Sequence, residues 1–389
     1  MTEDHASKSC PAGHRAPNLS FNETGACHVR GHAAARAALQ ARGTKQAGFM
    51  AGQFEAMQKT MRPPILFLEG EAHHEQRGQT ARFFTPTATD QRYRPLIEAL
   101  SEVLISELRA AGRADLCKFS ERLAIAVAAQ VVGMTSSRDG LIGERVATFF
   151  RFEEPVRGPR QWWRVVRAQL QTLNFYLRDV RPAIRARRRS PQDDVISHLL
   201  AQGYKPLEIL TECVTYAVAG MSTTREFIAM AAWHLLERPG LRARYLQAGE
   251  TERHALLQEI LRLEPVIGEL LRRAEHDLTL PDGESSVTIP AGTRLHIHVY
   301  GANTDEGAAG SCPHALQPGR ETSPGMRPAG LSFGHGPHTC PGAYVALHES
   351  DVFLRRLLAI ETLRIEQAPH VGRNEVTRGY ELRDFVVTV

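Results

Sequence analysis

The chain has 389 residues, of which 42% are hydrophobic and 23% are charged, and these proportions are typical of a folded, soluble globular protein. They disfavour disorder, collagen and coiled coil. The formal net charge is only +4, from 47 Lys and Arg against 43 Asp and Glu, so charge gives no support to nucleic-acid binding.

The cysteines and the apolar segments bear on the cellular setting. The six cysteines are widely spaced and form no CxxC pair, which favours a reducing, cytoplasmic setting over a disulfide framework. The first residues contain no apolar run of signal-peptide length. The most apolar segment, residues 213–236, is interrupted by Arg225 and Glu226, so we expect no membrane anchor.

Helices are predicted where apolar residues recur every three or four positions. The segment 205–240 is apolar on most of its circumference and should therefore run through the middle of the molecule. The arginines between residues 185 and 189 are interpreted as a solvated helix end, where cations complement the helix dipole. The predicted helices cover residues 93–112, 117–134, 161–189, 205–240 and 256–264.

Short strands follow the last of these helices. The segments "SVTIPAG" and "TRLHIHVY" have strand-like composition, and an irregular stretch rich in Gly and Pro runs from Gly301 to Gly330. No internal repeat and no linker with a change of composition interrupts the chain. The sequence therefore predicts a mainly α fold with a small β portion, in one domain over residues 1–389.

The stretch "FGHGPHTCPG" places Cys340 between glycines and a predicted helix. A lone cysteine is usually a small buried hydrophobe, but a helix N-terminus lowers the pKa of a thiol and favours a thiolate. A thiolate can be a nucleophile, a zinc ligand or a haem ligand. For zinc, the candidate pair His296 and His298 has no third ligand nearby in the sequence.

The same stretch resembles the haem-binding loop of the cytochromes P450, whose pattern is Phe-Gly-x-Gly-x-His-x-Cys-x-Gly. All fixed positions match, and Cys340 then implies the axial thiolate ligand of haem b. The matching residues are Phe333, Gly334, Gly336, His338, Cys340 and Gly342.

Two further motifs of that family occur upstream. Glu259 and Arg262 match its Glu-x-x-Arg pair, and Arg320 is the candidate for the arginine that joins them. In the family this trio maintains the fold and the haem loop. His73 and Arg77 match the His-x-x-x-Arg pair that binds the haem propionates.

The resemblance implies two more propionate ligands. These are His338 and Arg272, with Arg273 as the alternative to Arg272. Four donors around two carboxylates make chemical sense, because a buried anion needs charge-assisted partners.

The segment "AGMSTT" resembles the oxygen-binding kink of the family's central helix. Ala219 and Gly220 would leave room for dioxygen, and Thr223 would guide protons to it. Ser222 departs from the family, which usually has an acid there, and Glu226 is a distant candidate to replace that acid. Without the cysteine loop, small residues for close helix packing would be the default interpretation.

The resemblance covers residues from about Pro63 to the C-terminus, and residues 1–60 match weakly. It implies the P450 fold, with haem between the long central helix and the helix after Cys340. The implied activity is monooxygenation of a small hydrophobic or aromatic substrate with dioxygen. Electrons would come from a ferredoxin and its NAD(P)H-dependent reductase, with Arg92 and Arg94 as candidate docking residues. Neither nucleic acid nor membrane is expected as a partner.

Two alternatives remain open. Ser222 leaves open a peroxide-driven or redox-neutral haem-thiolate enzyme, and a non-catalytic haem-thiolate sensor is the other. The substrate pocket is expected to include Tyr216, Ile267, Leu270 and Leu271. Pro341 either deprives the sulfur of a backbone hydrogen bond or simply begins the helix.

Overall fold

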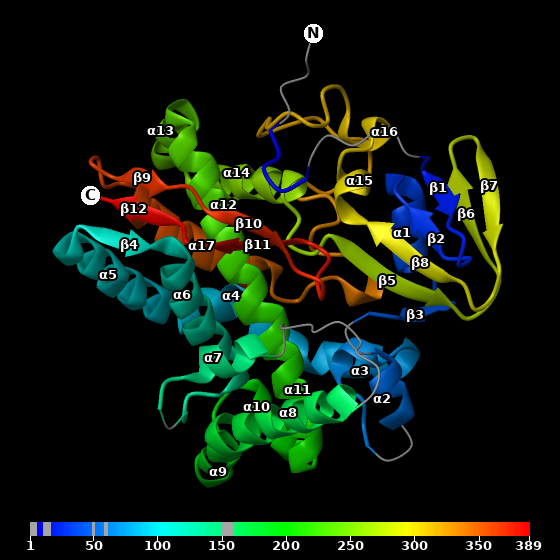
Figure 1. The fold of residues 1–389 in the computed structure, drawn as a ribbon, viewed down its shortest axis with the longest axis horizontal. Helices are drawn as coiled ribbons and strands as arrows, with labels where there is room; N and C mark the ends of the chain where they lie inside the picture. Colours follow the sequence, from blue (N-terminus) through cyan, green and yellow to red (C-terminus); the bar gives the residue numbers. More distant parts are fainter. Residues whose placement is uncertain (1–5, 11–16, 49–50, 58–60, 138, 149–158) are drawn as a thin grey trace.

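The computed structural model describes residues 6–10, 17–48, 51–57, 61–137, 139–148 and 159–389. Helices dominate, as predicted (Figure 1). The α-helices are α1 His32–Gln40, α2 Ala51–Met57, α3 Gly70–Thr80, α4 Pro86–Ala88, α5 Arg94–Ala111, α6 Leu116–Val132, α7 Ile142–Ala147, α8 Pro159–Phe175, α9 Arg181–Arg189, α10 Val195–Ala201, α11 Pro206–Ala217, α12 Thr223–Glu237, α13 Pro239–Gln247, α14 Glu250–Leu263, α15 Val299–Asn303, α16 Glu306–Ala309 and α17 Ala343–Leu358.

Tighter and wider helical turns connect some of these helices. The 3₁₀ turns are η1 Ile65–Phe67, η2 Ala81–Phe84 and η7 Gly336–His338, and the π turns are η3 Thr89–Tyr93, η5 Tyr176–Val180 and η6 Val218–Ser222. The strands are β1 Leu19–Phe21, β2 Cys27–Val29, β3 Thr44–Gln46, β4 Arg113–Asp115, β5 Glu269–Ala274, β6 Leu278–Asp282, β7 Ser285–Ile289, β8 Arg294–His298, β9 Arg364–Gln367, β10 His370–Arg373, β11 Tyr380–Arg383 and β12 Val386–Thr388.

The central helix is one continuous unit made of α11, η6 and α12. It crosses the middle of the molecule in Figure 1, where α12 packs against α6, α14 and α17. Most side chains of α12 are buried, because the segment is apolar around nearly its whole circumference. The predicted central position of this helix is confirmed, and the π turn η6 interrupts its regular geometry. The predicted end at residue 240 is wrong, because Arg238 leaves the helical conformation and Pro239 begins α13.

A five-stranded sheet in the order β1-β2-β8-β5-β3 forms the largest β element. The parallel pairing of β2 with β8 joins the N-terminal part of the chain to the C-terminal half, with Cys27 opposite Leu295. Helix α1 and the sheet share a separate hydrophobic cluster. The weakly matched residues 1–60 therefore contribute strands β1 to β3 to this sheet.

The segment predicted as one helix over residues 161–189 forms α8, η5 and α9 without a break. Its arginine-rich end is not wholly solvated, because Arg187 is only 4% exposed and pairs with Asp194. The prediction of a solvated end is therefore wrong at Arg187.

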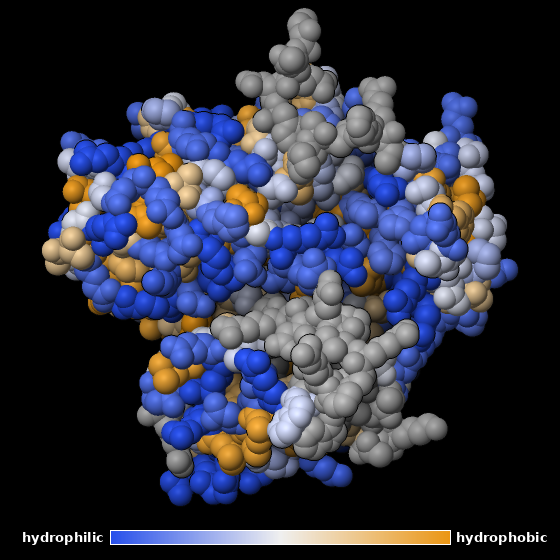
Figure 2. Space-filling view, in the orientation of Figure 1, coloured by the Kyte–Doolittle hydropathy of each residue, from blue (hydrophilic) through white to orange (hydrophobic). Residues whose placement is uncertain are grey.

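Figure 2 shows a mainly hydrophilic surface with scattered apolar residues. Among the described helices, none combines the length and apolar composition needed to cross a bilayer.

Candidate active site

Cys340 lies at the end of a tight loop before α17. Its backbone N–H donates to the carbonyl oxygen of Phe333 at 2.8 Å, which closes the loop. Gly336 has a φ of +68°, and a Cβ atom there would lie 2.6 Å from the carbonyl oxygen of Leu39 at the end of α1. Since an L side chain fits neither that backbone conformation nor that contact, the loop needs glycine here.

The sulfur of Cys340 accepts a hydrogen bond from the backbone N–H of Gly342, the N-cap residue of α17. Burial nevertheless raises the pKa of the thiol, and Gly342 and Arg77 only oppose this effect. Without a bound cation, burial therefore outweighs the effect of the helix N-terminus on this sulfur. A coordinating cation deprotonates a thiol outright, so a metal ligand is the better chemical fit than a free nucleophile.

Pro341 lies outside the helix, since α17 begins at Ala343 and Gly342 is its N-cap. The interpretation of Pro341 as the first residue of the helix is therefore wrong. Its lack of a backbone N–H leaves Gly342 as the neighbouring amide that donates to the sulfur.

Arginine and histidine side chains converge beside the cysteine. The rings of His73 and His338 stack with their centroids 4.0 Å apart. The Arg77 guanidinium donates to the carbonyl oxygen of Thr339, the residue before Cys340. Burial lowers the pKa of His73 to about 4, and the nearby His338 and Arg77 act in the same direction. A neutral His73 is thus available as a hydrogen-bond donor to an anion.

Arg272 lies with His73, Arg77 and His338 beside the cysteine loop, whereas Arg273 does not. Because side chains alternate along a strand, Arg272 on β5 is buried at 3% exposure, whereas Arg273 points outward and pairs with Glu55. The Glu69 carboxylate lies between Arg272, at 3.1 Å, and His338, at 2.9 Å. Although burial works against ionisation, these two neighbours keep the pKa of Glu69 below its usual value.

Ala219 and Gly220 in the central helix have different surroundings. Ala219 is exposed although its helix crosses the core, so an open space lies beside it. A Cβ atom on Gly220 would instead lie 3.3 Å from the Cβ of Ala128 on α6. Gly220 therefore allows close helix packing and does not widen the open side, contrary to the expectation that it leaves room for dioxygen. The Thr223 hydroxyl donates to the carbonyl oxygen of Ala219 across the π turn.

Ser222 and Thr223 also line a groove of about 860 Å³ beside α6 and the C-terminal loops. Glu226 lines the same groove, but its carboxylate is fully engaged. It pairs with Arg225 and with Arg383 at 3.1 Å, and it accepts the backbone N–H of Leu382 at 2.7 Å. Since this carboxylate ties α12 to β11, Glu226 is not a mobile replacement for the missing acid.

Glu259 and Arg262 lie on α14, and Arg320 joins them from the irregular loop. The buried Arg262 guanidinium contacts Glu259 at 2.7 Å and 2.8 Å, and Arg320 reaches the same carboxylate at 3.4 Å. Both arginines also donate to carbonyl oxygens of the irregular loop, including that of Ala315. The trio therefore clamps that loop to α14.

The expected pocket residues do not share one surface. Tyr216 stacks on Phe84, with centroids 5.9 Å apart, and burial raises the pKa of its phenol. Leu270 packs against the hydrophobic cluster under the sheet, while Leu271 lies on the opposite face, where a Cβ on Gly48 would contact it at 3.5 Å. Leu270 is therefore not in a pocket with Leu271. Ile267 is partly buried in the loop before β5.

The proposed docking arginines are internally paired. Arg92 pairs with Asp193, and Arg94 pairs with Asp90 at 2.8 Å and contacts Glu250 at 3.5 Å. These pairs lie between partly exposed side chains, and the docking role of Arg92 and Arg94 stays a prediction.

Comparison with known proteins decides the family. A family model described as "Cytochrome P450" matches residues 254–375, which include the Glu259 trio and the Cys340 loop. The "Cytochrome P450 130" of Mycobacterium tuberculosis is 27% identical over 316 residues, which cover 79% of this chain and 74% of the relative. The chain belongs to the cytochrome P450 family.

Further relatives agree with this assignment. The "C-19 steroid 1alpha-hydroxylase" of Sorangium cellulosum is 28% identical, and the match covers 81% of this chain and 75% of the relative. The crystal structure of P450BioI in complex with an acyl carrier protein ligated to hexadec-9Z-enoic acid has a TM-score of 0.77 at 22% identity, covering 99% of this chain and 95% of that chain. The chain therefore has the P450 fold.

As a P450, the protein is a monooxygenase enzyme whose cofactor is haem held by a cysteine thiolate. The side chains present fit such a group. Cys340 offers a sulfur at the start of α17, and two arginines and two histidines converge next to it. This donor set suits a cofactor that carries both a soft metal-binding centre and carboxylates.

Sequence reasoning missed two acids at this site. Glu69 contacts Arg272 and His338, and its position as N-cap of the His73 helix was the available signal. Glu349 on α17 is 3% exposed and is hydrogen-bonded to Thr224, while burial raises its pKa well above the usual value. It links α17 to the central helix next to Thr223.

Proposed function

We propose that Cys340 is the axial ligand of the haem iron and that His73, Arg77, Arg272 and His338 bind the propionates. The observation that supports this most strongly is the placement of Arg77, whose guanidinium reaches the residue next to Cys340. Arg272 and His338 already contact Glu69. A propionate bound by either side chain would therefore share that hydrogen-bond donor with the Glu69 carboxylate. Phe333, Gly334 and Gly342 would shape the loop around the ligand.

Haem, when bound, supplies oxygen activation. We propose that this chain's contribution is to hold and move protons at Thr223, whose hydroxyl is positioned by the carbonyl of Ala219. Ser222 would contribute a second hydroxyl from the same groove. We assign a structural role to Glu259, Arg262 and Arg320, which anchor the loop leading toward the cysteine. The chain would act as a single domain over residues 1–389.

The proposed substrate is a small hydrophobic or aromatic molecule. Support comes from the steroid hydroxylase among the relatives. The proposed electron donors are a ferredoxin and its NAD(P)H-dependent reductase. The peroxide-driven enzyme remains the second candidate, because Ser222 replaces the usual acid and Glu226 is not free to substitute for it.

The ligand assignment is tested by Cys340→Ala, with Cys312→Ala at an exposed cysteine as the matched control. We expect the long-wavelength Soret band of the reduced, carbon-monoxide-bound protein to be lost in the first variant and retained in the second. Retention of the band in Cys340→Ala would refute the assignment.

The reaction type is tested with substrates found by a spectral screen of apolar metabolites against the ferric protein. Product formed with ferredoxin, reductase and dioxygen supports the proposal. Product formed only with hydrogen peroxide selects the peroxide-driven enzyme. Ligand binding without any product under either condition would point to the non-catalytic sensor and overturn the proposal.

A further inference from the structure

Two histidines and a carboxylate meet between α14 and α17, outside the site described above. Glu250 and His254 lie one turn apart on α14, and His348 comes from α17. One ligand atom from each of the three residues lies within 4.8 Å of the others. The Nδ1 atom of His348 is 3.8 Å from the Oε1 atom of Glu250. Ligands of a tetrahedral zinc ion stand roughly 3.3 Å apart, so closure needs a shift of up to about 1.5 Å.

Three histidine ring nitrogens in this cluster lack hydrogen-bond partners. His348 is 0% exposed, and both of its ring nitrogens are buried without a partner, as is the Nε2 atom of His254. Buried polar atoms in native proteins are nearly always paired. Tyr344 stacks on His348, with centroids 5.9 Å apart, and offers its ring face rather than a polar atom. The unpaired nitrogens therefore point to a ligand.

The charges around the cluster suit a cation. Arg94 contacts Oε2 of Glu250, so Oε1 is left facing His348. Asp90 pairs with Arg94, and Asp351 pairs with Arg253. An aspartate therefore balances the positive charge of each arginine, and the negative charge of Glu250 is left unbalanced.

We propose that Glu250, His254 and His348 form a binding site for a divalent metal ion of the zinc class, with one coordination position left for water. Two imidazoles and one carboxylate match the ligand preference of zinc, whereas calcium and magnesium prefer oxygen ligands alone. The half-exposed Glu250 side chain gives the ion access from solvent. A bound ion would join α14, which carries Glu259 and Arg262, to α17, which follows Cys340.

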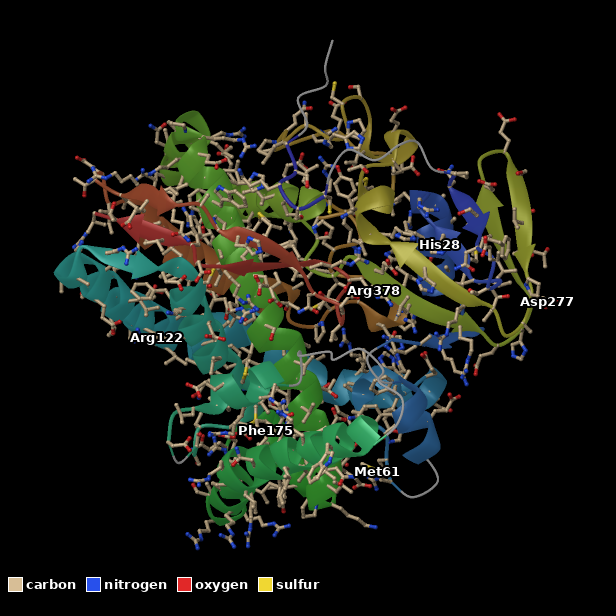
Figure 3. The ribbon with its side chains drawn as sticks, viewed as in Figure 1. His28, Met61, Arg122, Phe175, Asp277 and Arg378 are labelled. Carbon is tan, nitrogen blue, oxygen red and sulfur yellow. The ribbon has the colours of Figure 1, made fainter. Side chains whose placement is uncertain are left out.

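A second histidine cluster provides the internal comparison. His28 on β2, labelled in Figure 3, contacts His298 on β8 at 2.8 Å between Nδ1 and Nε2. His296 contacts Glu269 at 2.9 Å. The pairing of β2 with β8 thus supplies the neighbours that the sequence did not reveal for His296 and His298. Because these nitrogens already hydrogen-bond within the cluster, it lacks the unpaired donors and acceptors found at His348.

The test uses the haem-loaded protein after treatment with a chelator and removal of that chelator. Zn²⁺ is added in competition with a chromogenic chelator, and X-ray absorption at the zinc edge reports the ligands without interference from iron. We expect one equivalent of bound Zn²⁺ with two imidazole ligands. His254→Ala and Glu250→Gln should each weaken binding, the first by at least about 100-fold, because it removes a direct ligand and even outer-shell losses cost roughly 10- to 100-fold. His28→Gln should leave the affinity unchanged.

Glu250→Gln is the variant expected to keep the native fold, because the Glu250 side chain is 41% exposed. The absorption spectrum of the reduced carbon-monoxide complex identifies any variant that loses its native haem site. Three results would overturn the proposal: no stoichiometric Zn²⁺ binding by the unmodified chain, unchanged affinity in both Glu250→Gln and His254→Ala, or loss of binding in His28→Gln.

Discussion

Glu212 on α11 is a buried acid whose protonation should control stability. Its side chain is 1% exposed, and one oxygen accepts from the backbone N–H of Ile65 at 3.0 Å and from Gln76 at 2.6 Å. The other oxygen has no partner. Burial raises the pKa of Glu212 from 4.5 to about 7, so the folded state holds a proton that the unfolded chain releases.

The sign and size of the effect follow from linkage. Between the two pKa values the folded state binds more protons, so stability falls as pH rises from about 4.5 to about 7 and is then constant. A difference of about 2.5 pKa units corresponds to about 3 kcal/mol at 1.36 kcal/mol per unit. Glu212→Gln keeps the acceptor oxygen and cannot ionise. The variant should therefore gain about 2.5 kcal/mol relative to the original chain on going from about pH 5 to about pH 8.

The assay is urea unfolding of both proteins across this pH range, with Glu208→Gln as the matched control one turn earlier on α11. Although burial works against ionisation, the backbone N–H groups of Lys205 and Arg62 hold the pKa of Glu208 below its usual value. Its contribution to stability is constant above about pH 4.5 and is lost only on further acidification, so this control should show no dependence on pH between about pH 5 and about pH 8. A difference between Glu212→Gln and the original chain that does not vary with pH would refute the reasoning.

Three further substitutions test the site. Ser222→Asp adds a carboxylate that can carry protons, so the ratio of product to NAD(P)H consumed should change; an identical ratio would mean that protons travel by another route. Pro341→Leu adds a backbone N–H near the sulfur and should raise the ferric/ferrous potential by some tens of millivolts; spectroelectrochemical titration measures this, and an unchanged or lower potential contradicts it. Glu259→Gln leaves the charges of Arg262 and Arg320 uncompensated, and should lower the free energy of unfolding by about 3 kcal/mol; a loss below about 1 kcal/mol would show that the loop carbonyls suffice.

Local motifs were the predictable part of this protein. The glycine spacing around Cys340 and the i, i+3 placement of Glu259 and Arg262 depend on residues close in the chain, and the structure places them accordingly. Strand alternation, once β5 is known, selects Arg272 over Arg273. The long central helix followed from its apolar composition.

Contacts between distant segments were not predictable in this way. Gly220 was expected to face the open side, yet its direction depends on the packing of α6. Burial of the Cys340 sulfur raises the thiol pKa against the effect of the helix terminus, and burial is a property of the whole fold. His254 and His348 are separated by more than ninety residues, so no spacing rule could bring them together.

The π turn η6 accommodates one extra residue within the central helix. A π turn holds one residue more than the equivalent α-helical turn, so the wider turn Val218–Ser222 keeps α11 and α12 in nearly the register of an uninterrupted helix. Removing one residue between Ala219 and Thr223 would therefore restore a regular helix and leave Tyr216 stacked on Phe84. Thr223 would then follow Ala219 by three residues instead of four, and its hydroxyl would lose the present arrangement with the Ala219 carbonyl. The extra residue thus sets the position of the threonine hydroxyl separately from the packing of the two helices.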